Sequence, residues 1–302
     1  AVRAAEDRAG IKVALLISCG DFQATRNRTD LECLACPPKY RRLNDFHKYY
    51  AGERVAPVTT LFIGGNHEAS NFMQELPCGG WVAPNIFYMG YACVVEFAGL
   101  RIGGMSGIFN ARHYQTPHFE RSPYTPNTLR SVYHIRQVDV FRMGLLERGS
   151  ANEAAGGASA STEPRRLDVF LSHDWPQGIA FYGNVHELVR KKSYFKREIG
   201  DGSLGSPPMA HLLHTLRPRY WFSAHLHVKI AAVVNHSASA IAGPSDTQQF
   251  DPMSLAAPSN KGGGSEPVVT RFLALDKAIP GKKFLQLLSL DGDNGGGATE
   301  RS

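Results

Sequence analysis

The sequence predicts an α/β protein whose strands deliver polar side chains to one edge of a sheet. Four short apolar runs are typical of buried strands, and segments with helical spacing lie between them. Each run leads into a loop that carries Asp, Asn or His: CGD at 19–21, GGNHE at 64–68, SHD at 172–174 and SAHLH at 223–227. Because open α/β sheets bind ligands at the carboxyl ends of their strands, we expect the four loops to form one site.

Size and composition are ordinary for a globular protein and favour an anionic partner. The chain has 302 residues, enough for one large domain or two small ones, and 43% of them are hydrophobic. No apolar run approaches the roughly 20 residues of a membrane span, and no signal peptide is evident, so we expect no membrane partner. The formal net charge of +6 favours anionic partners.

The cysteines give no disulfide framework. There are five, an odd count without regular spacing, which favours a reducing compartment. Cys33 and Cys36 have the spacing of half a zinc site, but no second pair completes it, so buried or surface thiols are the favoured interpretation.

The first residues have the pattern of a helix end that feeds a strand. Residues 1–9 are rich in Ala, Arg and Glu, carry no N-cap residue and stop at Gly10, which favours a helix C-terminus. A strand is predicted directly afterwards, at 13–17. In α/β proteins a helix that leads into a strand usually follows an earlier parallel strand. We therefore expect that a strand and its loop are missing upstream of Ala1.

The remaining elements are predicted from periodicity and from turn residues. Helices are expected at 30–35, 43–52 and 128–146, and strands at 58–63, 93–97, 100–102, 271–275 and 284–290, the last two paired around a turn at 280–281. Segments rich in Gly, Ser and Ala at 149–165 and 236–267 are predicted to be flexible insertions, and the tail at 291–302 to be disordered. Because no insertion separates a complete set of polar loops, we predict a single catalytic domain over 1–290.

The polar loops together supply the donors of a transition-metal site. Asp21, Asn66, His173, His225 and His227 offer mixed oxygen and nitrogen atoms, which suit Fe²⁺, Zn²⁺ or Mn²⁺ better than Ca²⁺. His225 and His227 are two residues apart, so both rings point the same way from a strand end. A single carboxylate such as Asp21 is able to bridge two ions about 3.5–4 Å apart. We therefore predict one or two divalent ions that clamp a phosphate and activate a water molecule.

His67 lies beside a predicted ligand and is the candidate catalytic residue. It is placed to stabilise the transition state or to protonate the leaving oxygen. Each motif taken alone has a structural interpretation: Asp21 as a turn residue, His173 with Asp174 as a hydrogen-bonded core pair, and the HxH of 225–227 as an ordinary strand end. Their joint occurrence, each after an apolar run, favours metal ligation over these alternatives.

The segment 106–136 interleaves aromatic rings with cations. Rings stack on bases and cations follow phosphates, so this composition suits single-stranded nucleic acid, although an exposed loop with ordinary charges has the same composition. The residues predicted to bind RNA are Arg112, His113, Tyr114, Tyr124, Arg130, Tyr133, His134 and Arg136.

The sequence around the polar loops is similar to one family. The matching stretches are CGDFQA (19–24), PPKYR (37–41), FIGGNHEASN (62–71), GGWVAPNI (79–86), SGIF (106–109), LSHDWP (171–176) and WFSAHLHVK (221–229). The GD, GNHE, H and AHLH motifs resemble the calcineurin-like metallophosphoesterases as a whole. The flanking residues resemble the RNA lariat debranching enzymes within that superfamily. The resemblance covers about 15–235 and resumes at 271–290.

This resemblance implies a fold, an activity and a set of roles. The implied fold is a four-layer α/β/β/α sandwich with mixed sheets. The implied activity is hydrolysis of the 2′-5′ phosphodiester bond at the branch point of excised intron lariat RNA, in the nucleus, with no obligate protein partner evident. By motif matching, Asp21 bridges two metal pockets, Asn66, His173 and His225 complete one, and His227 belongs to the other.

The same resemblance places His67 near the leaving group and the segment 106–136 around the RNA. The family begins with a strand that ends in a Cys-x-His or Asp-x-His loop, which fills the pocket shared with His227. This sequence lacks that loop, either because it is truncated at its N-terminus or because the chain is a degenerate paralogue. We therefore expect the other pocket to bind one ion and the activity of this chain to be impaired. The alternatives are another calcineurin-like phosphoesterase and a catalytically impaired relative that binds RNA.

Overall fold

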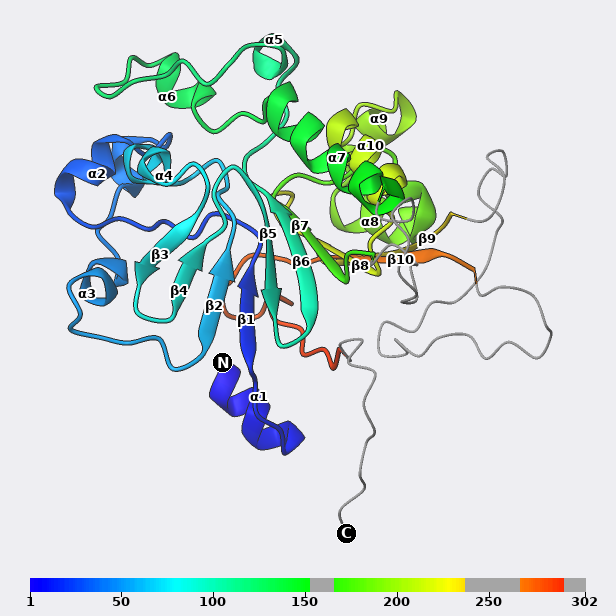
Figure 1. Cartoon of the computed structure of the whole chain (residues 1–302), viewed down its shortest axis with the longest axis horizontal. Coiled ribbons are helices and arrows are strands. Elements are labelled where there is room, and N and C mark those ends of the chain that lie inside the picture. The colour runs from blue at the N-terminus through cyan, green and yellow to red at the C-terminus, as the bar shows by residue number, and fades with distance from the viewer. Residues whose placement is uncertain (153–165, 237–266, 291–302) are drawn as a thin grey trace.

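The computed structural model describes residues 1–152, 166–236 and 267–290, and it contains two mixed β-sheets packed face to face (Figure 1). One sheet has the order β1-β2-β4-β3, with β1 (Leu15–Ser18), β2 (Thr59–Phe62), β3 (Gly80–Ala83) and β4 (Ile86–Tyr88). The other has the order β5-β6-β7-β8-β10-β9, with β5 (Ala92–Phe97), β6 (Leu100–Met105), β7 (Val169–Ser172), β8 (Tyr220–Ser223), β9 (Ile230–Asn235) and β10 (Val269–Ala274).

Helices cover the outer faces of both sheets. α1 (Val2–Ala9) precedes β1. The four-stranded sheet is covered by α2 (Arg28–Glu32), α3 (Phe46–Tyr50) and α4 (Ser70–Glu75), and the six-stranded sheet by α7 (Gln137–Asn152), α8 (Val185–Lys191), α9 (Phe195–Gly200) and α10 (Pro207–Leu216). The connections contain the 3-10 turns η1 (Pro38–Tyr40) and η3 (Ile179–Tyr182) and the short helices α5 (Ala111–Tyr114) and α6 (Thr128–Ser131).

The central strands carry apolar residues that are buried on both of their faces. Successive residues of a strand point to opposite faces. In β2, Leu61 packs between the sheets while Phe62 packs against the helices of the four-stranded sheet. In β7, Leu171 packs between the sheets while Phe170 packs toward α7 and α10. These apolar layers make an α/β/β/α sandwich, as the family resemblance implies.

Most predicted elements are confirmed with bounds that differ by a few residues, but β6 is longer than predicted. Its two glycines belong to the strand, which pairs with β5 on one side and β7 on the other. A Cβ at Gly104 would lie 2.8 Å from Ile63 of the facing sheet, and a Cβ at Gly103 would lie 3.0 Å from Leu167. These glycines therefore allow neighbouring layers to approach and do not mark a turn.

The helix predicted over 128–146 is wrong in its middle, where α6 ends and α7 has not begun. In this gap the Ile108 amide donates to the Tyr133 carbonyl, and the Ile135 amide donates to the Ile108 carbonyl. The backbone groups that a helix would use are therefore taken by a bridge to a distant segment. α7 also continues through Asn152, into the first residues of a predicted insertion.

The strand predicted at 284–290 is wrong as well. That segment has no regular structure, and β10 pairs instead with β8 and β9. The strands β3, β4 and β9 were not predicted. The segments 153–165, 237–266 and 291–302, which contain the rest of the predicted insertions and the tail, lie outside the described residues. The single catalytic domain over 1–290 stays a prediction. Of the helices described, none is both long and apolar enough to cross a membrane.

Candidate metal centre

Four strands bring their polar loops together where the two sheets meet. Asp21 follows β1 and Asn66 follows β2 in one sheet, whereas His173 follows β7 and His225 follows β8 in the other. Both pairs of strands are parallel, so each pair places its loops side by side. Nε2 of His173 lies 3.1 Å from Oδ1 of Asn66 and 3.4 Å from Oδ1 of Asp21. The structure thus joins side chains that are up to 152 positions apart in the sequence.

A backbone hydrogen bond fixes which nitrogen of His173 faces this point. Its Nδ1 lies 2.7 Å from the carbonyl oxygen of Cys19, so Nδ1 carries the hydrogen and donates. Nε2 then presents a lone pair to the oxygens of Asn66 and Asp21. Metal-binding histidines are commonly oriented by such a bond from the other ring nitrogen.

The spacing of these donors fits one ion. Two ligands that are each about 2.1 Å from a metal ion lie roughly 3.0–3.4 Å from one another. Within the described residues, no three His, Cys, Asp or Glu groups form a metal cage by themselves. The third donor at this point is the amide oxygen of Asn66. The residues present therefore fit a divalent ion held by Asp21, Asn66 and His173.

The two histidines that follow β8 lie beside this point. The ring centroid of His225 is 5.0 Å from that of His173. Burial lowers the pKa of His173 and of His225, and burial together with Lys277 lowers the pKa of His227 to about 4. All three imidazoles are therefore neutral at pH 7, which is the form that binds metal ions.

Three of the predicted ligands have a left-handed backbone. The φ angles are 55° at Asp21, 60° at His225 and 53° at His227. Residues other than glycine adopt this conformation rarely, and such strain gathers at functional sites. The loops therefore hold these side chains in orientations that a relaxed chain would not favour.

Two glycines allow the loops to approach one another. A Cβ at Gly20 would lie 2.3 Å from Nδ1 of His173, and a Cβ at Gly65 would lie 2.3 Å from Oδ1 of Asp21. Any side chain at either position would displace a predicted ligand. Both glycines therefore have a steric reason, and Gly20, with φ 100°, has a conformational one as well.

Glu68 joins the first two loops. Its carboxylate accepts hydrogen bonds from the amides of Phe22 and Gln23, both at 2.8 Å, and of Gly65 at 3.1 Å. Its side chain is only 2% exposed, and burial, followed by the charge of Asp21, raises its pKa to about 7. Glu68 therefore positions the loop that carries Asp21. Sequence analysis assigned it no role, although its place at the end of GGNHE was a signal.

His67 lies on the same loop as Asn66, with its backbone fixed and its ring half-buried. Its amide donates to Oδ1 of Asp21 at 3.0 Å. Its ring is close enough to contribute, after burial, to the lowered pKa of His173 and of His225. His67 therefore stands next to the donor set.

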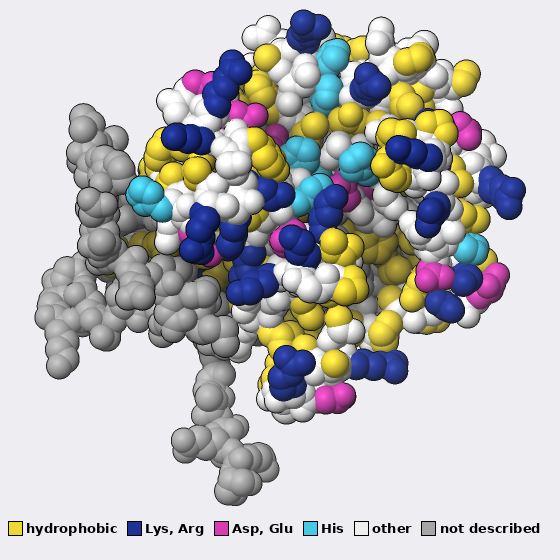
Figure 2. Space-filling model, turned by 180° about the vertical axis from the view of Figure 1, so that it is seen from behind, with side chains coloured by type: hydrophobic (Ala, Val, Ile, Leu, Met, Phe, Trp, Pro, Cys, Tyr) yellow, Lys and Arg dark blue, Asp and Glu magenta, His cyan; other side chains and the backbone are white. Residues whose placement is uncertain are grey.

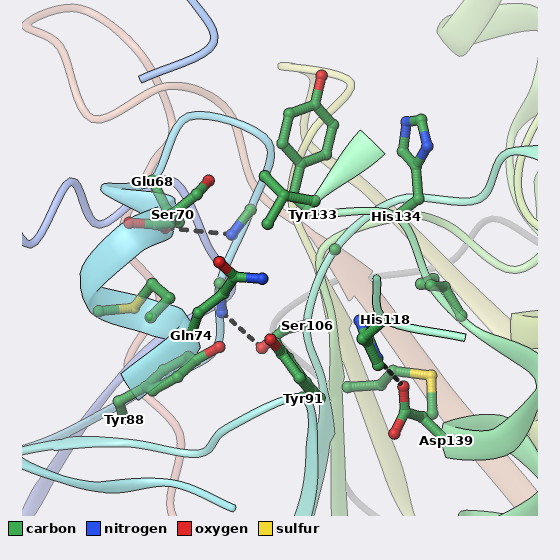
Figure 3. Close-up of a pocket in the computed structure, with 17 residues that line it drawn as sticks. Glu68, Ser70, Gln74, Tyr88, Tyr91, Ser106, His118, Tyr133, His134 and Asp139 are labelled. Carbon is green, nitrogen blue, oxygen red and sulfur yellow. Dashed lines mark hydrogen bonds and ion pairs between the residues drawn. The ribbon is translucent and has the colours of Figure 1, made fainter. Parts of the chain in front are cut away.

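A pocket adjoins the metal loops on the side of the segment 106–136 (Figure 3). It extends from Gly65 and Glu68 to side chains that sequence analysis had not assigned, which are Gln74, Tyr91, His118 and Asp139. In it, Nε2 of His118 lies 2.7 Å from Oδ2 of Asp139, and the His118 ring stacks on Tyr91 with centroids 4.0 Å apart. The pocket connects the metal loops with the predicted RNA-binding segment.

The eight residues predicted to bind RNA are unequally exposed. Two are exposed (Arg112 and Arg130), four are half-buried (His113, Tyr114, Tyr124 and Tyr133), and two are buried (His134 and Arg136). His134 packs on His113, with 2.8 Å between their Nδ1 atoms. The hydroxyl of Tyr124 donates to Oε1 of Gln74, at the pocket.

Arg136 does not suit direct contact with RNA. Its side chain is fully buried against the equally buried Glu120, with 2.5 Å between nitrogen and oxygen. It also donates to the carbonyls of His113 at 2.8 Å and Ser131 at 3.1 Å. Because a fully buried guanidinium is out of reach of a phosphate, Arg136 is better explained as the residue that holds this segment in shape.

The fold and the site define the class of protein first. Two mixed sheets between layers of helices, with polar loops at the carboxyl ends of the strands, form an α/β fold consistent with a metallophosphoesterase. No family model matches the chain.

Individual relatives are more specific. The chain is 48% identical over 288 residues to lariat debranching enzyme A of Xenopus laevis. The alignment covers 95% of this chain and 46% of that protein. It is 47% identical over 289 residues to the lariat debranching enzyme of Homo sapiens, an alignment that covers 96% of this chain and 46% of that protein. It is 49% identical over 284 residues to the lariat debranching enzyme of Arabidopsis thaliana, with 94% of this chain and 57% of that protein covered. The chain is therefore homologous to the lariat debranching enzymes over nearly all of its length. It spans about half the length of the curated relatives it matches.

Proposed function

We propose that this chain hydrolyses the 2′-5′ phosphodiester bond at the branch point of excised intron lariat RNA, with one or two divalent metal ions. The observation that carries the proposal is the meeting of a carboxylate, an amide oxygen and an imidazole lone pair at one point, from Asp21, Asn66 and His173. These acceptors repel one another unless a cation lies between them. The names of the relatives supply the substrate.

The chain supplies two sets of donors to such ions. Asp21, Asn66, His173 and His225 would hold one ion, and His227 with Asp21 would contribute to a second. When bound, a divalent ion polarises a phosphoryl oxygen and lowers the pKa of a coordinated water molecule to near 7. The mixed oxygen and nitrogen donors favour Fe²⁺, Zn²⁺ or Mn²⁺. Because the proposed substrate is a product of splicing, the proposal includes a nuclear location.

His67 would deliver a proton to the leaving 2′ oxygen. General acid catalysis requires a titratable ring beside the reacting group, and the half-buried His67 stands next to the donors. The hydrogen bond from its amide to Asp21 couples its position to that of a metal ligand. The proton donor and the ion would therefore be aligned by the same loop.

The segment 106–136 would hold the RNA beside this centre. Arg112 and Arg130 are exposed and would pair with phosphates, while the half-buried rings of Tyr114 and Tyr133 would stack on bases. The positive net charge of the chain supports an RNA partner.

A cleavage assay with three substrates tests the proposal. The chain, loaded with Mn²⁺, Fe²⁺ or Zn²⁺, is offered a branched RNA with a 2′-5′ bond, a linear 3′-5′ RNA of the same sequence and a phosphopeptide. We expect cleavage of the branched RNA alone. Cleavage of the phosphopeptide instead would identify a different phosphoesterase, and binding of branched RNA without cleavage by the metal-loaded chain would identify an RNA-binding relative.

Two variants separate the proposed roles. His67→Ala should retain metal and lose at least about 100-fold in cleavage rate, because a general acid contributes about that much or more. Asn66→Ala should lose metal as well as activity. His211→Ala, which removes an exposed histidine on α10, is the matched control and should match the parent chain in both. Retained activity in His67→Ala would remove it from the mechanism.

A further inference from the structure

A second group of cations and rings lies on the other side of the metal centre from the segment 106–136. In the six-stranded sheet, β7 and β8 stand in the middle and carry His173 and His225. On one side β6 leads into the segment 106–136, and on the other side stand β10 and β9. Figure 2 shows Lys and Arg side chains gathered around a central group of histidines on one face of the molecule.

Two lysines come from the turn that follows β10. β10 runs parallel to β8 with Ala274 opposite Ser223, so the residues after each strand leave the sheet together. Lys277 follows Ala274 closely and is exposed. Lys283 closes the same turn, because its carbonyl accepts the amide of Asp276 at 3.1 Å. This turn therefore lies beside the loop that carries His225 and His227.

Lys192, at the end of α8, joins this turn. Nζ of Lys229, two residues after His227, donates to Oε1 of Gln286 at 2.7 Å, and α8 packs against η3, which packs against β9, the strand that pairs with β10. Lys283 lies near α8, since its charge adds to the effect of Lys191 in lowering the pKa of Glu187. Lys191 is paired with Glu187 at 2.6 Å. In the part of the chain that the structure describes, no carboxylate forms an ion pair with Lys192, Lys277 or Lys283.

Exposed rings flank these lysines. Phe181 and Tyr182 of η3 are 45% and 47% exposed, and Tyr194, which precedes α9, is 63% exposed. η3 packs against α8 and β9, and Nζ of Lys192 lies 5.8 Å from the centre of the Tyr194 ring. Exposed rings beside cations without acidic partners are the composition with which proteins bind single-stranded nucleic acid.

We propose that these residues form a second RNA-binding surface, the lysine–tyrosine shelf, which consists of Phe181, Tyr182, Lys192, Tyr194, Lys277 and Lys283. This inference rests on the proposed function. A branched nucleotide has three strands that leave from one sugar, and they diverge in different directions. The segment 106–136 takes one strand, and the shelf takes another on the far side of the metal centre. The scissile bond is then held over the ions from both sides.

A charge-reversal variant tests the shelf. Lys192→Glu, Lys277→Glu and Lys283→Glu are combined, and binding of fluorescently labelled branched RNA is measured by anisotropy in EDTA, which prevents cleavage. We expect at least a tenfold loss of affinity. We also expect the slope of log affinity against log salt to become shallower by about 2, because each phosphate contact to a single strand contributes roughly 0.7.

The matched control changes the same net charge elsewhere. Arg3→Glu, Arg8→Glu and Lys12→Glu alter exposed residues in and after α1, on the other side of the molecule from α8 and β9 (Figure 1). This variant should lose less than threefold in affinity. Equal losses in the two triple variants would overturn the shelf, because a general change in charge would then explain both.

A truncated substrate separates the shelf from the proposed function. Branched RNAs are each shortened in one of their three strands. The RNA that lacks the strand held by the shelf should bind the parent chain more weakly than the full branched RNA does. The combined Tyr182→Ala and Tyr194→Ala variant should lose no further affinity when that strand is absent from the RNA. If the parent chain does not cleave branched RNA, the proposed function fails, and anisotropy with a linear single-stranded RNA still decides the shelf. If it cleaves and the shelf variants bind as the control does, the shelf alone fails.

Discussion

At the scale of single residues, the metal loops depend on a buried carboxylate as much as on the ligands. Glu68 accepts amides from the loop after β1 and from its own loop, and so fixes the backbone around Asp21. The meeting of Asp21, Asn66 and His173 could be predicted from the sequence, because each follows an apolar run. The role of Glu68 could not, because it depends on a partner 46 positions away.

Replacing Glu68 by Gln should weaken both folding and metal binding. The amide nitrogen of Gln donates and does not accept, so at least one buried backbone amide loses its partner. Such a loss costs about 1–3 kcal/mol of unfolding free energy. Urea denaturation measures that loss, and calorimetric titration with Mn²⁺ measures the affinity. Glu53→Gln, at an exposed position, is the control, and equal stability of the two variants would argue against the role of Glu68.

His134 should make the fold sensitive to acid. Burial, followed by the neighbouring His113, lowers its pKa from 6.5 to about 4. Above pH 6.5 the ring is neutral in the folded and the unfolded chain, so the full stability is present. As the pH falls from 6.5 to 4, only the unfolded chain takes up the proton, and the unfolding free energy drops by up to about 3 kcal/mol.

The variant His134→Gln isolates this contribution. Unfolding free energies from urea denaturation at pH 7 and pH 5 should differ less in this variant than in the parent chain. His186→Gln, at an exposed position on α8, should keep the difference of the parent chain. If His134→Gln keeps it too, other buried histidines account for the acid sensitivity.

At the scale of elements, a buried ion pair shapes the predicted RNA-binding segment. Arg136 and Glu120 are both fully buried, and Ser131 donates its hydroxyl to the same carboxylate. The pair closes the stretch between α5 and α7, which has little regular structure of its own. Its composition of rings and cations was visible in the sequence, but the burial of Arg136 was not, because it arises from a contact between two parts of an irregular segment.

Arg136→Met should therefore destabilise the fold and loosen the segment. Removing one partner of a buried ion pair leaves the other charge unpaired, which costs about 3–5 kcal/mol. Amide hydrogen exchange should accelerate at 108–136 more than in β2 or β7. The double variant Glu120→Gln with Arg136→Met should recover part of the stability, since no unpaired charge remains. Arg112→Met, at an exposed position, is the control. A double variant that is less stable than Arg136→Met would count against this explanation.

Elements were predictable where local pattern and tertiary packing agree. The apolar runs of β2 and β7 are buried on both faces, so their sequences alone indicate strands. The glycines of β6 and the break between α6 and α7 were not predictable. In both places the deciding contact comes from another layer or another segment: Ile63 against Gly104, and Ile108 with Tyr133.

At the scale of the whole molecule, the candidate metal centre joins the two sheets. Asp21 and Asn66 extend from the four-stranded sheet, and His173 and His225 extend from the six-stranded one. The sheets are also held together by the apolar layer between them and by the hydrogen bond from His173 to the carbonyl of Cys19. An ion bound by both sets of donors would therefore resist the separation of the sheets that unfolding requires, and not only the opening of a loop.

Metal should accordingly stabilise the whole fold. At a free concentration of Mn²⁺ 100 times its dissociation constant, binding to the folded chain alone adds about 2.7 kcal/mol to the unfolding free energy. Thermal unfolding with increasing Mn²⁺ should show a rising midpoint in the parent chain and in His211→Ala. It should show no rise in His173→Ala or in Asn66→Ala, which remove donors from opposite sheets. If removal of the Asn66 donor leaves the rise intact while removal of His173 abolishes it, the ion is bound to one sheet only, and the centre does not link the two.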